Sequence, residues 1–417
     1  MKQYKIQATI HLDTTITLPP SKSISNRALV IHALSGGSCC PQNLSDCDDT
    51  NVIIKALQDM PYEIDIKAAG TAMRFMTAYL AVTDGEHVLT GTERMKHRPI
   101  EVLVNALKYL GADIEYVGEE GYPPLRIRGK ALDGGKIEVP GNISSQYISA
   151  LLMIGPVLRN GLELKMTGNI ISRPYIDLTL WTMREFGAQA DWTAGDTVVV
   201  NPGRYQQRKY LIENDWSAAS YWYEMVALSR DDDAIVHLNG LMDGSKQGDS
   251  VVRYIFSMLG VKTVFKSRKQ NTPTTVTLKK SGRVVPRLDY DFINSPDLAQ
   301  TVVVCCVALG VPFHFRGLAT LKIKETDRIE ALCTEMRKMG VVLHIENDSE
   351  LIWDGERCDA SLLPIDTYED HRMALSFAPM SLRMESLRIN DPMVVTKSYP
   401  AYWDDLRQAG FTVEEEG

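Results

Sequence analysis

The sequence predicts an α/β fold in which a unit of strands and helices occurs six times and is distributed over two domains. The chain has 417 residues, which is above the size at which one hydrophobic core usually gives way to two. Amphipathic helical segments recur every 70 to 80 residues, and helical segments of a second kind lie between them. Together, the length and the two sets of helices predict a repeated architecture.

Five of the amphipathic helices end in the same way. Each has apolar residues at three- and four-residue spacing, followed by a glycine, an apolar residue and a strand-like pattern. Glycine readily takes the left-handed conformation that terminates a helix. We expect five such helices at 100–110, 176–186, 251–259, 329–339 and 402–409, ended by Gly111, Gly187, Gly260, Gly340 and Gly410. A sixth, at 52–60, stops at Pro61 instead, and Asp48 or Asp49 is expected to be its N-cap.

The second set of helices is rich in Ala and Ser. Small side chains on all sides of a helix are typical of burial between packed elements. These helices open at Ser21, Gly70, Ser144, Asp215, Ser295 and Asp370. Each repeat is therefore expected to run strand, helix, strand, helix, strands. Most of these residues should be core, but the first turns contain nearly all the unusual polar residues of the chain.

Composition limits the class of protein. The net charge of −8 disfavours general affinity for nucleic acid or anionic membranes, so an anionic ligand must meet a local basic cluster. The longest apolar stretch, 302–309, is too short to cross a bilayer. The first ten residues alternate like a strand and do not resemble a signal peptide, so we expect the mature protein to begin at or near Met1.

Cysteine and histidine usage favours a reducing, cytoplasmic location. The seven cysteines include the adjacent pairs Cys39–Cys40 and Cys305–Cys306, and no C-x-x-C spacing occurs. The eight histidines are dispersed, without metal-ligand spacing to another His or Cys. We expect no structural zinc and no metal cofactor.

Helix starts in the first half of the chain favour anion binding. A helix that begins near Ser21 presents backbone N–H groups, hydroxyls and the cations Lys22 and Arg27 at one end. At the next such helix, Gly70 allows close approach to backbone, and Arg74 follows one turn later. A capped, solvated helix end and a simple packing glycine are the alternative interpretations.

Two further segments of this half are unusual. Residues 94–98 place cations just ahead of a helix whose first residue is expected to be Pro99, and cations there oppose the helix dipole unless an anion binds. Residues 141–146 offer hydroxyl and amide donors, and 172–175 a hydroxyl, a guanidinium and a phenol. Capping by Ser144 and simple surface placement are the alternatives.

The second half adds carboxylates at the same repeat position. Asp297 follows Pro296 at the start of an apolar helix, while residues 324–328 and 369–372 alternate acids and cations at helix starts. Lys397 is expected in a loop. Each alone is compatible with a solvated ion pair, which contributes little stability. Their recurrence at one repeat position favours a functional site.

Together these motifs resemble the 5-enolpyruvylshikimate-3-phosphate synthase family, also called 3-phosphoshikimate 1-carboxyvinyltransferase. The resemblance runs from Leu18 to Lys397, and its most specific parts are residues 21–27, 70–74, 94–100, 144–146, 324–328 and 370–373. It implies two similar domains, each of three strand-helix-strand-helix-strand-strand repeats (an inside-out α/β barrel), with a closing active-site cleft between them. Domain I would hold residues 1–19 and 213–417, with phosphoenolpyruvate-side cations and catalytic acids. Domain II, residues 20–212, would bind shikimate-3-phosphate.

The resemblance also implies a reaction. The enolpyruvyl group of phosphoenolpyruvate would move to the 5-hydroxyl of shikimate-3-phosphate, with release of phosphate, on the pathway to chorismate and aromatic amino acids. Asp297 would take the hydroxyl proton, and Glu325, with Lys22, would handle the protons of the methylene carbon. No cofactor is implied, and we expect a cytoplasmic monomer inhibited by glyphosate.

The implied binding residues fall into two sets. The shikimate-3-phosphate set is Lys22, Ser23, Arg27, Ser144, Ser145, Gln146, Ser172, Tyr175, Asp297 and Lys324. The phosphoenolpyruvate set is Lys22, Gly70, Arg98, Arg328, Arg372 and Lys397. Because both substrates carry a carboxylate and a phosphate, their approach requires many fixed cations.

The chain departs from the family pattern at three positions. Ala68 and Thr320 stand where Asn is common, and Phe75 stands where Pro is common. The UDP-N-acetylglucosamine enolpyruvyl transferase family shares the architecture but lacks counterparts of residues 21–23 and 144–146. A non-catalytic shikimate-phosphate binding homologue is a second alternative, although binding of polyanions alone would not favour acids such as Asp297 and Glu325.

Overall fold

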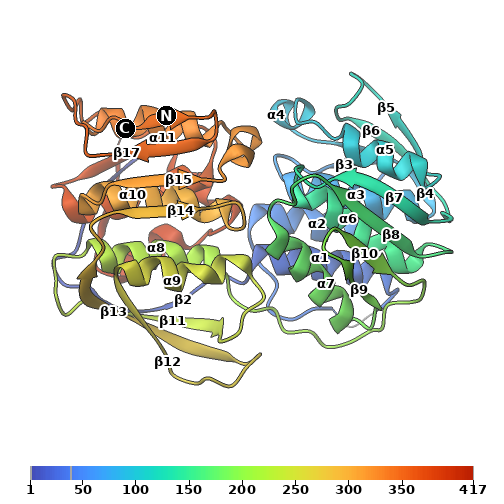
Figure 1. Cartoon of the computed structure of the whole chain (residues 1–417), viewed down its shortest axis with the longest axis horizontal. Helices are drawn as coiled ribbons and strands as arrows, with labels where there is room; N and C mark the ends of the chain where they lie inside the picture. The colour runs from blue at the N-terminus through green and yellow to red at the C-terminus, as the bar shows by residue number, and fades with distance from the viewer. Residues whose placement is uncertain (1, 38–39, 417) are drawn as a thin grey trace. The chain divides into compact units, whose positions relative to one another are not determined.

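The computed structural model describes residues 2–37 and 40–416, so Cys39 of the first cysteine pair lies outside the described residues. The chain divides into two compact units (Figure 1). Unit 1 contains Met1–Pro19 and Glu213–Gly417, and unit 2 contains Pro20–Ile212. Each unit has its own hydrophobic core. No helix of the described residues is long and apolar enough to cross a membrane.

Two repeats of unit 2 form four-stranded mixed sheets with the same topology. In each sheet two parallel strands are joined by a buried helix, and an antiparallel hairpin follows a second helix. The first contains β3 (Glu63–Asp65), α3 (Gly70–Val82), β4 (Gly85–Thr90), α4 (Glu93–Lys96), α5 (Glu101–Tyr109), β5 (Asp113–Tyr116) and β6 (Leu125–Gly129), in strand order β3-β4-β6-β5. The second contains β7 (Gly135–Pro140), α6 (Ser145–Ile154), β8 (Leu162–Thr167), α7 (Arg173–Glu185), β9 (Ala190–Ala194) and β10 (Thr197–Val200), in order β7-β8-β10-β9.

The third part of unit 2 has helices but only a trace of a sheet. It contains α1 (Lys22–Leu34) and α2 (Asp48–Asp59). Its described strand pairing is one parallel bridge between Gln42 and Leu211. Here the two helices are supported by the rest of the unit, because α1 packs on α3, α6 and α7.

Unit 1 repeats the same topology. One sheet, in order β12-β13-β11-β2, uses β2 (Asp13–Thr17), α8 (Trp216–Leu228), β11 (Ile235–Met242), α9 (Val252–Met258), β12 (Leu259–Phe265) and β13 (Pro273–Val284). A second, in order β14-β15-β17-β16, uses β14 (Leu288–Asp291), α10 (Ala299–Leu309), β15 (Phe313–Arg316), α11 (Arg328–Lys338), β16 (His344–Glu346) and β17 (Glu350–Trp353).

The last repeat of unit 1 is completed by the N-terminal strand. It contains α12 (His371–Phe377), β18 (Leu387–Asn390), α13 (Tyr402–Gln408) and β19 (Thr412–Glu416). The strand β1 (Gln3–Gln7) lies between β18 and β19, antiparallel to both. The start of the chain is therefore an internal strand of the sheet that the end of the chain builds.

The expected helix ends are present. The five glycines after α5, α7, α9, α11 and α13 all have φ between +77° and +100°. At the sixth helix, α2, Met60 takes the left-handed conformation with φ of +40°. The predicted α/β class and the five left-handed glycines are therefore confirmed. The sixth helix was expected to stop at Pro61 and ends instead at the left-handed Met60, and its part of the chain lacks the sheet predicted for each repeat.

Three local predictions were wrong. The N-cap of α2 is Cys47, while Asp48 and Asp49 lie in the first turn, where their charge favours the helix dipole. α5 begins at Glu101, because the carbonyl of Pro99 instead accepts hydrogen bonds from Arg74 and Tyr147. Lys397 is the last residue of a 3-10 turn, Pro392–Lys397, and not part of an irregular loop.

Candidate active site

The polar residues singled out in the sequence form one group in each unit. In unit 2, the serine-rich group surrounds the first turns of α1, α3, α6 and α7, and contains Lys22, Ser23, Arg27, Gly70, Arg98, Ser144, Ser145, Gln146, Ser172 and Tyr175. In unit 1, the carboxylate–arginine group lies at the starts of α10, α11 and α12 and at the end of the 3-10 turn before α13. It contains Asp297, Lys324, Glu325, Arg328, Asp370, Arg372 and Lys397.

Arg27 holds the first turns of α1 and α7 together. Its Nε donates to the Thr179 hydroxyl at 2.7 Å, and its terminal nitrogens donate to the carbonyls of Ser23 and Tyr175 at 2.9 and 3.3 Å. The guanidinium also lies over the ring of Phe75, 5.4 Å from the ring centroid. Burial lowers the pKa of Arg27 to about 10, so the side chain is still a cation at neutral pH. Its charge is available electrostatically, although most of its donors are already used.

Phe75 lies inside α3. The helix runs continuously from Gly70 to Val82 and Phe75 is buried in it. The contact with Arg27 gives this side chain a role in positioning the guanidinium.

Lys22 is paired with an acid that the sequence interpretation did not select. Its Nζ lies 3.0 Å from Asp49 Oδ2, and the Asp49 carboxylate is 6% exposed. Asp49 lies in the first turn of α2, an ordinary place for an acid. The one feature of the sequence that could have identified Asp49 as a site residue is its position at the start of a repeat helix, where other candidate site residues lie.

Gly70 and Arg98 are in direct contact. A Cβ atom built at Gly70 would lie 2.7 Å from a terminal nitrogen of Arg98. Of the three cations at 94–98, Lys96 instead pairs with Glu93 at 2.6 Å and is part of the surface. The side chain of Arg74 is buried and donates to the carbonyls of Gly70 and Pro99, so it shapes the turn beside Arg98.

Gln146 joins α6 to α3. Its side-chain amide donates to the Thr71 hydroxyl at 3.0 Å, while Ser144 caps α6 by accepting from the Gln146 N–H at 3.3 Å. Ser172 is buried and has φ of +53°, a left-handed conformation that is uncommon outside glycine. Such strain is found at functional sites more often than elsewhere. Arg173, next in the chain, stacks on Trp192 at 3.8 Å and does not join the group.

Arg328 is the centre of the carboxylate–arginine group. This guanidinium is 2% exposed and contacts Asp370 at 2.6 Å, Glu325 at 3.0 Å and Asp297 at 3.1 Å. Burial alone would lower the pKa of Arg328, but the three carboxylates, Asp370 foremost, raise it above its ordinary value. A buried charge of this kind is tolerated only where partners surround it.

Each of the two partly exposed acids also has a second cation. Asp297 accepts from Arg372 at 2.9 Å, and Glu325 accepts from Lys397 at 2.8 Å. Their side chains remain 19% and 14% exposed, whereas Asp370 is fully buried and caps α12 through the Arg372 N–H. Asp297 and Glu325 can therefore meet a ligand, while Asp370 serves to hold Arg328.

Lys324 and Tyr221 complete the surroundings of Asp297. The ammonium of Lys324 lies 3.6 Å from Asp297, and burial lowers the pKa of this lysine. Tyr221 accepts a hydrogen bond from Arg372 at 3.2 Å, and burial raises the pKa of the phenol to about 12. The phenol is therefore neutral at pH 7 and adds no charge to the group.

Asp249 was also missed from the sequence. It lies in the 3-10 turn Gly248–Val251 before α9, is 3% exposed and accepts a hydrogen bond from Ser217. Burial and the nearby charge of Asp297 raise the pKa of Asp249 to about 6. Like Asp49, it begins the second helix of its repeat, and only the repeat position distinguishes it from an ordinary first-turn acid.

Thr320 stands close to Lys324 in the sequence, in the 3-10 turn Ala319–Ile323. Its hydroxyl is buried and has no hydrogen-bond partner among the residues that the structure describes. The described residues contain no cluster of three or more His, Cys, Asp or Glu side chains arranged to hold a metal ion. The chemistry available in the two groups is that of fixed cations, hydroxyl and amide donors, and carboxylates able to exchange protons.

Comparison with known proteins identifies related chains. A family model described as EPSP synthase (3-phosphoshikimate 1-carboxyvinyltransferase) matches residues 6–65 and 60–406. The 3-phosphoshikimate 1-carboxyvinyltransferase of Bacteroides fragilis is 58% identical over 413 residues, covering 99% of both chains. That of Aliivibrio fischeri is 34% identical over 436 residues, covering 98% of this chain and 99% of the relative. The structure of EPSP synthase from Acinetobacter baumannii shares the fold, with a TM-score of 0.79 at 21% identity and full coverage of both chains.

Proposed function

This chain belongs to the EPSP synthase (3-phosphoshikimate 1-carboxyvinyltransferase) family, and we propose that its serine-rich and carboxylate–arginine groups act on the same pair of substrates. The enzyme transfers the enolpyruvyl group of phosphoenolpyruvate to the 5-hydroxyl of shikimate-3-phosphate and releases phosphate. The finer architecture implied by the family, two similar domains of three repeats with a closing cleft, is part of this proposal.

One observation carries the assignment of roles. Arg328 contacts both Asp297 and Glu325, and each acid has a further cation of its own. Cations suit the phosphate and carboxylate of phosphoenolpyruvate, whereas acids beside them oppose the binding of an anion. Acids held at fixed positions among cations suit proton transfer next to a bound anion.

The chemical steps follow from these positions. Asp297 removes the proton of the 5-hydroxyl of shikimate-3-phosphate while the hydroxyl oxygen bonds to the C2 atom of phosphoenolpyruvate. Glu325, with Lys22, supplies a proton to the C3 methylene, which gives a tetrahedral ketal with a methyl group. The C2–O bond to phosphate then breaks, a methyl proton returns to Glu325, and the double bond re-forms.

The serine-rich group fits shikimate-3-phosphate. It offers the hydroxyls of Ser23, Ser144, Ser145 and Ser172, with Lys22 and Arg27 as cations for the phosphate. We assign Tyr175, Gln146, Asp297 and Lys324 to the same ligand. Lys22, Gly70, Arg98, Arg328, Arg372 and Lys397 are assigned to phosphoenolpyruvate. A monomeric, cytoplasmic enzyme without a cofactor completes the proposal.

The direct test is phosphate release from purified protein given both substrates, either alone, and neither. Release only with both substrates is expected, and it should survive a chelator because the proposed charge stabilisation comes from Lys and Arg. UDP-N-acetylglucosamine in place of shikimate-3-phosphate should release nothing. Release with phosphoenolpyruvate alone, or activity that EDTA removes and a divalent ion restores, would contradict the proposal.

A further inference from the structure

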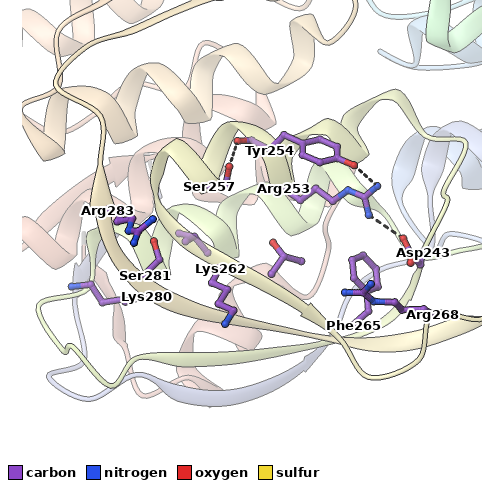
Figure 2. A pocket seen from close by; sticks show the side chains of 12 residues that line it. Asp243, Arg253, Tyr254, Ser257, Lys262, Phe265, Arg268, Lys280, Ser281 and Arg283 are labelled. Carbon is purple, nitrogen blue, oxygen red and sulfur yellow. Dashed lines mark hydrogen bonds and ion pairs between the residues drawn. The ribbon is translucent and has the colours of Figure 1, made fainter.

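A basic groove lies in unit 1, away from the carboxylate–arginine group in the sequence and on different elements. It is bordered by α9, β12 and β13 and has a volume of about 880 Å³ (Figure 2). That volume lies in the range of about 300 to 1,000 Å³ that is usual for small-molecule sites. Its basic side chains are Arg253, Lys262, Arg268, Lys280 and Arg283.

The charge of this region is opposite to that of the chain. Residues 250–288 contain nine Lys and Arg residues and no Asp or Glu, whereas the whole chain has a net charge of −8. Asp243 is the acid among the residues that line the groove. A concave surface lined by charges of one sign concentrates ions of the other sign.

Three of the groove cations are in no ion pair of the described residues. Lys262, Arg268 and Arg283 form no ion pair with any residue that the structure describes. Some exposed cations on other sheets are paired, as Lys165 is with Glu138 at 3.1 Å and Arg128 with Glu115 at 2.9 Å. A bound polyanion would supply these three cations with partners of opposite charge.

The remaining two cations are held in place by the protein. Arg253 pairs with Asp243 at 3.1 Å and lies over the rings of Tyr254 and Phe265 (Figure 2). Lys280 donates to the carbonyl of Ser229 at 2.8 Å. The groove therefore combines two anchored cations with three free of acidic partners, and the ring of Tyr254 is 59% exposed beside them.

We propose that this groove binds the polyphosphate chain of a small ligand. The cations come from α9, β12, β13 and the connection between the two strands, so they are distributed along the groove and not gathered at one point (Figure 2). Such a distribution suits several linked phosphates better than a single phosphate. The polyphosphate is inorganic or belongs to a nucleotide, whose base would then stack on Tyr254.

The test compares two triple variants of the full chain with the parent by titration calorimetry with tripolyphosphate. The groove variant is Lys262→Gln, Arg268→Gln, Arg283→Gln. The control is Lys136→Gln, Arg159→Gln, Lys165→Gln, which removes the same charge from exposed, paired positions of unit 2. The affinity of the groove variant should fall by about ten-fold or more, and the control should match the parent. Both variants should keep the parental melting temperature and kcat/KM.

Catalytic anion positions are excluded by repeating the titration in protein saturated with shikimate-3-phosphate and glyphosate. The difference in tripolyphosphate affinity between the groove variant and the control should persist. This result would stand even if the assigned catalytic function were wrong. Equal losses in both variants, or no loss in the groove variant, would overturn the proposal. So would a single-stranded oligonucleotide that binds the parent more than about ten-fold more tightly than tripolyphosphate, since it would indicate a nucleic-acid surface.

The source of the phosphates is settled by a second arm with ATP. A nucleotide site would be identified if ATP binds more tightly than tripolyphosphate and if Tyr254→Ala removes this difference in affinity. Equal affinities would identify an inorganic polyphosphate site. Either result supports the groove as a polyphosphate site, provided that the groove variant lowers both affinities.

Discussion

At the scale of single residues, the two proposed catalytic acids are held by the cations that would also meet phosphoenolpyruvate. Asp297 touches Arg328, Arg372 and Lys324, and Glu325 touches Arg328 and Lys397. In the absence of ligand, the acids therefore neutralise the cations and keep them in position. Replacing either acid by a neutral residue removes a group that can exchange protons, which should lower turnover. It also removes a negative charge beside the cations, which should favour anion binding.

Asp297→Asn separates the two effects. Loss of the proton acceptor should lower kcat by roughly 10²- to 10⁴-fold. The affinity for phosphoenolpyruvate should stay the same or increase, because three cations lose an opposing charge. Steady-state kinetics together with equilibrium binding measure both quantities, and Asp354→Asn, an exposed acid, is the control. Near-parental turnover would show that Asp297 is not the base.

Glu224 is a buried acid outside both groups. It lies on α8 with no exposed surface, and neither carboxyl oxygen has a hydrogen-bond partner among the described residues. Burial raises the pKa of Glu224 well above its usual value, so the folded state keeps the proton at pH values where the unfolded chain has lost it. The unfolded chain loses that proton above about pH 4.5. Stability from this group is therefore fully present below that pH and is lost as pH rises toward the folded-state pKa.

Glu224→Gln should remove this pH dependence. Between the unfolded-state and folded-state pKa values of Glu224, the parent should lose about 1.4 kcal/mol of unfolding free energy per pH unit relative to the variant, since one proton is released on unfolding. Urea denaturation between pH 5 and pH 8 measures the difference, with the exposed Glu119→Gln as control. Parallel curves for parent and Glu224→Gln would mean that the folded protein holds this carboxyl ionised.

At the scale of elements, the first turns of the buried helices concentrate the chemistry. At the start of α3, Gly70 leaves room for the guanidinium of Arg98, because any side chain at this position would meet it. The neighbouring helix start, that of α6, is fixed to it by the bond from Gln146 to Thr71. A change in the first turn of α3 therefore acts directly on an arginine assigned to phosphoenolpyruvate.

Gly70→Ala should displace Arg98, since the new methyl group would lie 2.7 Å from its guanidinium. Loss of one charged hydrogen bond should raise the KM for phosphoenolpyruvate by about ten-fold or more. Inhibition by glyphosate, which is bulkier, should weaken by a larger factor while remaining competitive with phosphoenolpyruvate. Rate series at several concentrations of both compounds measure this, with Gly203→Ala as control because its Cβ has open space. Unchanged sensitivity to glyphosate would show that the site is misplaced.

Elements with local signals were predictable from the sequence, and those with long-range causes were not. The glycines after five helices required left-handed backbone and were found to have it. The reduced sheet beside α1 and α2, and the insertion of β1 between β18 and β19, depend on partners far away in the chain. No local pattern encodes such pairings.

The same distinction separates the site residues that were predicted from those that were missed. Asp297 stands out in the sequence as an acid at the start of an apolar helix, and Arg328 as part of a run of alternating charges. The structure places the two in contact. Asp49 and Asp249 were missed because a first-turn acid is the ordinary complement of a helix dipole. Their partners, Lys22 and Ser217, become visible only once the helices are packed.

At the scale of the whole molecule, the chain passes between the units twice, at Pro19–Pro20 and at Ile212–Glu213. The two crossings are tied together within unit 1. The side chain of Asn214 donates to the carbonyl of Leu18 at 2.7 Å, and the Asp215 N–H donates to that of Pro19 at 2.9 Å. The proposed function requires the serine-rich and carboxylate–arginine groups to act on the same pair of substrates, and the closing cleft that it includes would move through these two connections.

The most direct measurement of this central claim is small-angle scattering from the intact protein. Shikimate-3-phosphate with glyphosate occupies both proposed substrate positions without turnover, so the closed state accumulates. The account predicts a smaller radius of gyration with both ligands than without ligand. An unchanged radius, in protein shown by calorimetry to be saturated with both, would contradict it.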